Sequence, residues 1–125
     1  MNIRLLGDIM QMIHKEVRLA ALDKGFALTL GGDHSVAAGT ISGMKSVYPN
    51  LKVLWIDAHS DCVIPEFAST KYRNYHGMPA SHLLGWIHKS ETPNFEWMQT
   101  PVLQPSDICY IGREKLCFVL FFNKI

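Results

Sequence analysis

The sequence has little net charge and no long apolar run. The first argues against a nucleic-acid partner, and the second against a membrane partner. Twelve basic and 11 acidic residues are spread over 125 positions, for a net charge of +1. Proteins that bind phosphate backbones concentrate Lys and Arg on one face, so we expect no nucleic-acid partner. No stretch approaches the roughly 18 apolar residues of a membrane span, so we expect no membrane partner. The first residues also lack the apolar core and cleavage site of a secretory signal.

Cysteines are few and form no metal-type pair. The chain has three, Cys62, Cys109 and Cys117. An odd number without close spacing favours a reduced intracellular setting, and we expect a cytoplasmic protein. Cys62 lies beside a candidate site, and a buried, inert side chain is the favoured interpretation over a reactive thiol.

The apolar pattern of the first half predicts alternating helices and strands. Residues 8–23 carry a helical apolar stripe that Gly25 is expected to end. Residues 26–30 ("FALTL") and 51–56 ("LKVLWI") read as buried strands, with a helix from Ser35 to about residue 47 between them. A strand–helix–strand unit of this length predicts a parallel sheet.

The second half predicts fewer regular elements. Residues 58–75 read as a polar loop, and 78–88 as a helix with a proline in its first turn. Residues 91–106 read as a loop with a short turn, and 107–112 as a third strand. We find no domain boundary in this pattern.

The motif "DAHSD" is the first candidate site. Asp57, His59 and Asp61 alternate along the chain, and in an extended backbone such side chains point to one side. They follow a predicted strand, at the sheet edge where parallel α/β proteins bind ligands. Neighbouring buried carboxylates need compensation, most simply by a divalent cation. Taken alone, the motif fits a polar strand end equally well.

The motif "GGDHS" is the second candidate. By itself it is more typical of a tight turn in which Asp33 or Ser35 caps the next helix. Gly31 and Gly32 would let the chain turn sharply and bring His34 to the cluster. Two such motifs at successive strand ends together predict a metal centre. Imidazole and carboxylate without thiolate suit manganese, with zinc left open.

The remaining histidines carry weaker signals. His76, in "YHGMP", is by itself more often a helix-entry residue than a catalyst. His14, His82 and His88 are predicted on helix surfaces, without a role. Trp55 is predicted in the core.

In order and spacing, "GGDHS", "DAHSD" and "HGMP" resemble the arginase family of the ureohydrolase superfamily, over about residues 10–112. The resemblance implies an α/β fold, a three-layer parallel β-sheet flanked by helices as in arginases and deacetylases, of which residues 1–112 form a partial domain. It also implies a homo-oligomer in the complete protein.

The resemblance further implies a binuclear manganese hydrolase that splits L-arginine into L-ornithine and urea through a metal-bridging hydroxide. By motif position, His34 and Asp61 would bind one ion, His59 the other, and Asp57 would bridge them. His76 matches a family histidine proposed to shuttle protons, a role that suits histidine because an imidazole gains and loses a proton near neutral pH.

Two departures from the family pattern affect the substrate. Val63 stands where arginases typically have Asn, and the loop from Asp61 to His76 is about two residues longer than usual. Asn74 matches an Asn that contacts the amino-acid end of the substrate. An agmatinase, or another guanidino or formimino hydrolase, is therefore the alternative.

The end of the sequence departs further. Residues 113–125, "REKLCFVLFFNKI", form a divergent tail that we assign to no family strand. Four of six expected metal ligands are present, and the two aspartates of a later motif are not. We therefore expect a truncated chain that is inactive alone. The alternative from another class is a non-catalytic fragment that binds metal or other subunits.

Overall fold

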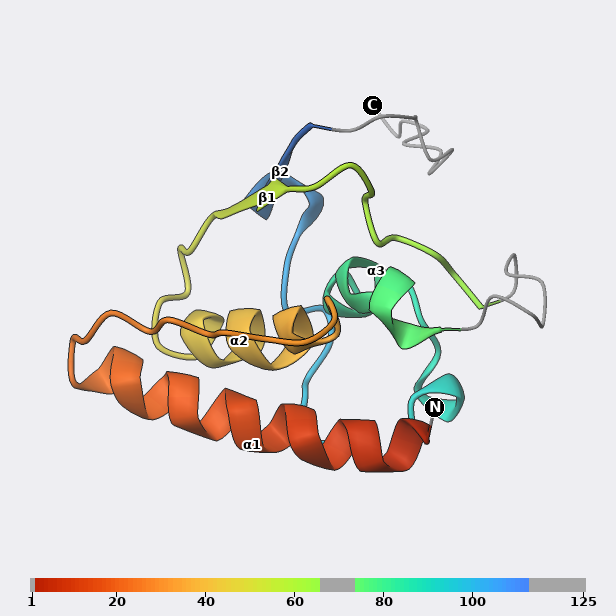
Figure 1. Cartoon of the computed structure of the whole chain (residues 1–125), viewed down its shortest axis with the longest axis horizontal. Helices are drawn as coiled ribbons and strands as arrows, with labels where there is room; N and C mark the ends of the chain where they lie inside the picture. The colour runs from red at the N-terminus through yellow and green to blue at the C-terminus, as the bar shows by residue number, and fades with distance from the viewer. Residues whose placement is uncertain (1, 66–73, 113–125) are drawn as a thin grey trace.

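The computed structural model describes residues 2–65 and 74–112. The helices are α1 (Ile3–Leu22), α2 (Val36–Lys45) and α3 (Pro79–Leu83), and the strands are β1 (Val53–Ile56) and β2 (Ile108–Ile111). Figure 1 shows α1 and α2 side by side, with the two strands apart from α1. Within the described ranges, none of the helices combines the length and apolar character needed to cross a bilayer.

The two strands form a parallel pair, as the sequence predicts. Val53 lies opposite Ile108, and Ile56 lies opposite Ile111. The amide of Asp57 donates to the carbonyl of Ile111 at 3.0 Å, so the ladder continues to the first residue of "DAHSD". The prediction that 51–56 is buried is only partly right. Trp55 is buried, but its neighbours Leu54 and Ile56 are exposed.

The predicted strand 26–30 is wrong. These residues have no strand geometry, and the exposed fractions of Phe26, Leu28 and Leu30 are 91%, 70% and 86%. The segment runs along α2 and α1 rather than beside β1 (Figure 1), and with α1 it lines a hollow of about 530 Å³. Its apolar composition suits a strand, but a strand also needs a hydrogen-bonded neighbour, and none lies beside it in the described part of the chain.

Helix α1 begins and ends at other residues than predicted. The side chain of Asn2 accepts hydrogen bonds from the amides of Arg4 and Leu5, so the helix begins five residues early. It ends at Leu22, and Lys24, not Gly25, adopts the left-handed conformation that follows.

Helix α2 packs closely against α1 because two of its residues lack a Cβ. A Cβ built on Gly39 would lie 2.7 Å from the carbonyl oxygen of Met10, and one on Gly43 would lie 2.7 Å from that of His14. The core continues from this contact to the sheet and α3. It includes Met10, Ala38, Trp55, Tyr75, Leu83, Phe95 and Leu103.

Helix α3 is shorter than the predicted 78–88, because Gly85 turns the chain with a φ of 75°. The carbonyl of Leu83 accepts from Val102 and Leu103, which fixes the returning chain. Three-residue 3₁₀ turns occur at Tyr75–Gly77 (η2), Lys89–Glu91 (η3) and Pro105–Asp107 (η4). Residues 58–65 are irregular, as predicted. The rest of the long loop, 66–73, and the tail 113–125 lie outside the described residues.

Candidate metal centre

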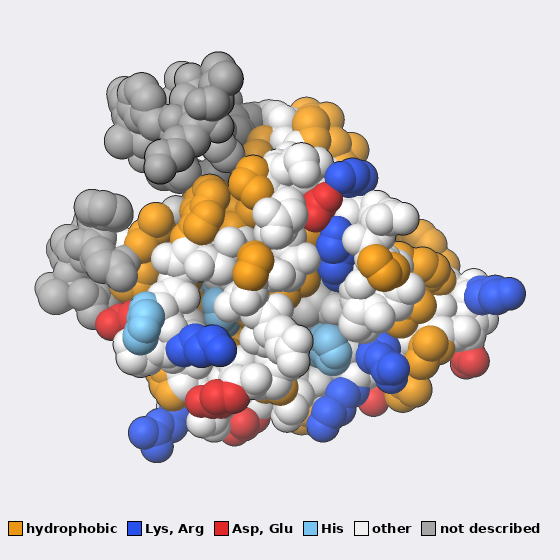
Figure 2. All heavy atoms as spheres, turned by 180° about the vertical axis from the view of Figure 1, so that it is seen from behind, with side chains coloured by type: hydrophobic (Ala, Val, Ile, Leu, Met, Phe, Trp, Pro, Cys, Tyr) orange, Lys and Arg blue, Asp and Glu red, His pale blue; other side chains and the backbone are white. Residues whose placement is uncertain are grey.

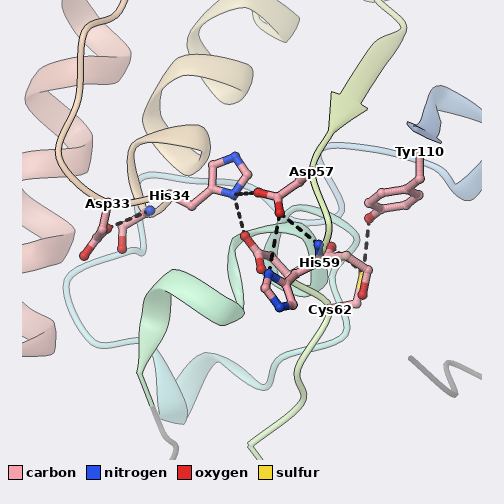
Figure 3. A network of polar contacts seen from close by, with 9 residues as sticks. Asp33, His34, Asp57, His59, Cys62 and Tyr110 are labelled. Atoms are coloured by element: carbon pink, nitrogen blue, oxygen red, sulfur yellow. Dashed lines mark hydrogen bonds and ion pairs between the residues drawn. The ribbon is translucent and has the colours of Figure 1, made fainter. Parts of the chain in front are cut away.

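Three of the four predicted ligands converge. His34 precedes α2, Asp57 follows β1, and Asp61 lies four residues further on. The Nδ1 atom of His34 is 2.5 Å from Oδ2 of Asp61 and 3.1 Å from Oδ2 of Asp57. Each of the three residues offers a ligand atom, all within 4.8 Å of one another. Figure 3 shows the imidazole of His34 pointing toward the carboxylate of Asp57.

Local contacts explain why His34 faces the strand end. A carboxylate oxygen of Asp33 accepts from the amide of Ser35 at 2.9 Å, so of the two predicted capping residues it is Asp33 whose side chain makes the bond at this turn. The imidazole of His34 packs on the indole of Trp55, with ring centroids 4.5 Å apart. Trp55 is in the core as predicted, but its contact with a candidate ligand is not evident from the sequence.

Asp57 lies between two histidines. One carboxylate oxygen, Oδ2, faces His34, and the other, Oδ1, is 3.6 Å from Nδ1 of His59. The same Oδ1 accepts from the amide of His59 at 2.8 Å. The side chain of His59 is 80% exposed, and the residue is not part of the three-residue cluster. The structure therefore places His59 beside the cluster, at the carboxylate oxygen of Asp57 that does not face His34.

The electrostatics of the cluster favour a cation. Burial raises the pKa of Asp61, and the nearby charge of Asp57 raises it further, while the charge and hydrogen bond of His34 oppose the rise. A positive ion among these groups would relieve the cost of holding the carboxylates together. The donor set of one imidazole and two carboxylates, half-buried and without thiolate, fits a hard or borderline divalent ion.

The other predicted site residues lie outside the cluster. Asn74 and His76 are exposed and flank the first residue of η2. Cys62 is buried, as predicted, with its sulfur 3.2 Å from the hydroxyl of Tyr110 (Figure 3).

His82 corrects a prediction. It is 3% exposed rather than on a helix surface, and its Nδ1 lies 2.7 Å from the hydroxyl of Tyr75. Its ring also packs edge-on against Phe95. The helical pattern around it is too short to show which face is buried.

Fold and cluster together define an α/β domain with a histidine–carboxylate centre at the end of a parallel strand. The model of the Arginase family matches residues 2–118. The chain belongs to the arginase family.

Similar proteins agree in sequence and in fold. An arginase from Eremothecium gossypii is 44% identical over 111 residues, which cover 89% of this chain and 27% of that protein. Arginase-1 of Homo sapiens is 39% identical, over 89% of this chain and 34% of its own. A crystal structure of arginase from Bacillus subtilis matches with a TM-score of 0.80 and 35% identity, covering 91% of this chain and 38% of that one. The chain thus spans about a third of the length of these relatives.

Proposed function

We propose that this chain supplies part of the active site of a manganese-dependent hydrolase that converts L-arginine to L-ornithine and urea. The observation that carries this proposal is the position of Asp57, whose two carboxylate oxygens face His34 and His59 separately. Membership of the arginase family and the arginases among its relatives support arginine as the substrate.

The proposed ligands divide into two sets around Asp57. His34 and Asp61 would hold one ion together, since both offer a ligand atom to the three-residue cluster. His59 would hold the second ion, and Asp57 would offer one carboxylate oxygen to each set of ligands. Divalent ions supply Lewis acidity and lower the pKa of bound water.

The substrate-side residues would act from η2. His76 would carry a proton between its imidazole and solvent, and its exposure permits this exchange. Asn74, two residues earlier and also exposed, would accept or donate hydrogen bonds at the amino-acid end of the substrate. Agmatine, which lacks the carboxylate at that end, is the alternative substrate.

A manganese titration tests the site. Asp57→Ala is expected to weaken Mn²⁺ binding about a hundredfold or more, because it removes a contact to both ions. Asp23→Ala, an exposed carboxylate at the far end of α1, is the matched control and should bind as the wild type does. Equal Mn²⁺ affinity in wild type and Asp57→Ala would contradict the site.

A urea assay tests the activity. The 125-residue chain with Mn²⁺ is expected to release no urea from L-arginine, because it supplies four of the six metal ligands that the resemblance to arginases implies. Release at a rate proportional to protein would show that these four suffice. Release from agmatine alone would replace arginine with agmatine as the substrate.

A further inference from the structure

The segment that carries Asp61 is held in an unfavourable backbone conformation. Asp61 has a φ of 45°, in the left-handed region that residues with a Cβ seldom adopt. Its carbonyl accepts from the amides of Ala80 and Ser81 at 3.1 and 3.4 Å. Two residues on, the amide of Val63 donates to the carbonyl of Gly77 at 3.0 Å. Three backbone hydrogen bonds thus hold residues 61–63 against residues 77–81.

One side chain takes part in this contact. Ser81 is fully buried, with an exposed fraction of 0%. Its hydroxyl donates to the carbonyl of Val63 at 2.6 Å, and the carbonyl oxygen of Met78 lies 2.8 Å from the same hydroxyl. Ser81 therefore joins α3 to the segment that follows Asp61.

We propose that Ser81 is a positioning residue for the metal centre, an inference that rests on the proposed function. Its side chain touches none of the ligand side chains, and it acts through the backbone of residues 61–63. Its bond to Val63 is one of four hydrogen bonds between residues 61–63 and 77–81, and its loss would weaken the hold on the left-handed conformation at Asp61. The carboxylate of Asp61, which meets His34 at 2.5 Å, would then be less firmly fixed.

The contact between residues 61–63 and 77–81 also connects the proposed metal ligands to η2, which carries the proposed proton-transfer residue His76. Gly77 ends η2, which contains His76, and its carbonyl accepts from Val63. A loosened segment 61–63 would therefore disturb the spacing between Asp61 and η2 as well as that between Asp61 and His34.

Mn²⁺ titration of the 125-residue chain tests the proposal. Ser81→Ala is expected to weaken binding about tenfold, as the loss of a residue that orients a ligand does. Hydrogen exchange should quicken at the amide of Val63 and stay unchanged in α1. Ser42→Ala is the matched control, because Ser42 is buried and its hydroxyl donates to Gly39 within α2, and it should keep wild-type affinity. Ser81→Cys, which keeps a weak donor of similar size, serves if Ser81→Ala does not fold.

The outcomes separate the two proposals. If Ser81→Ala binds Mn²⁺ as the wild type does, or if it loses no more affinity than Ser42→Ala, the positioning role is wrong and the metal site stands. If the wild type binds no Mn²⁺, the metal site is wrong and the role of Ser81 falls with it.

Discussion

Two apolar runs, 26–30 and 51–56, each precede a site motif, yet they differ in the structure. The second forms β1, pairs with β2 and buries Trp55. The first has no strand partner among the described residues and exposes Phe26, Leu28 and Leu30. The difference shows that an apolar run gives a tendency, whereas a strand requires a neighbour. Of the candidate ligands, His34 follows the exposed run 26–30. Asp57 and Asp61 follow the run 51–56, which contains β1.

The contrast extends over the surface. Figure 2 shows apolar side chains over the upper part of one face and along one side of it, with most of the charged ones over the lower part. Exposed apolar residues on the strands include Leu54, Ile56 and Ile111. The packed region is the core that α1, α2 and α3 share with Trp55 of β1.

The largest difference is expected between two Leu→Ala substitutions, one in the buried core and one in the exposed run 26–30, in their effect on the free energy of unfolding. Leu83→Ala removes a side chain that is 0% exposed and is expected to lower the free energy of unfolding by about 4 kcal/mol. Leu30→Ala, at 86% exposure, should change it by less than about 0.5 kcal/mol. Urea denaturation measures both, and similar losses would mean that the 26–30 run is packed after all.

Acid should weaken the packed region through His82. Burial lowers the pKa of His82 to about 4, so as the pH falls through 6.5 the unfolded chain binds a proton before the folded chain does. The stability is present above pH 6.5 and is lost toward pH 4, by about 3 kcal/mol for this group.

Urea denaturation at pH 7 and pH 4.5 measures this loss. His82→Phe should flatten the dependence, while the exposed His88→Ala should leave it unchanged. An unchanged slope in His82→Phe would show that other groups cause it.

Glycine substitutions give a third, smaller contrast. Gly43→Ala is expected to destabilise the chain by about 2 kcal/mol, although Ala favours helices, because the added Cβ meets the carbonyl oxygen of His14 at 2.7 Å. Gly32 follows the exposed run 26–30, and a Cβ built on it would meet no atom within 4 Å. Gly32→Ala should therefore leave the melting temperature nearly unchanged, and an equal drop in both variants would contradict the close approach of α1 and α2.

Leu30→Lys is expected to change the stability of the fold least of these variants. It should nevertheless clearly reduce self-association. A charge on an exposed apolar run opposes self-association, so light scattering should show less aggregate at high concentration. Lys24→Leu, exposed in the preceding turn, should act in the opposite direction. Unchanged aggregation in both variants would show that association uses another surface.

The sequence predicts what depends on local pattern. The helix period locates α1 and α2, and the paired motifs predict His34, Asp57 and Asp61, which do converge. It does not predict what depends on neighbours in space. The exposure of 26–30, the burial of His82 and the bond from Ser81 to Val63 each follow from contacts between distant segments.

The central claim is that ligands from both regions bind one metal centre, and proton NMR of the histidine rings with substoichiometric Mn²⁺ tests it most directly. Paramagnetic broadening should affect the rings of His34 and His59 first, because they lie nearest the two carboxylate oxygens of Asp57. The ring of His14, packed on Trp97, and that of the exposed His88 should keep their intensity. Uniform broadening, or earlier broadening of His14 or His88, would contradict the site.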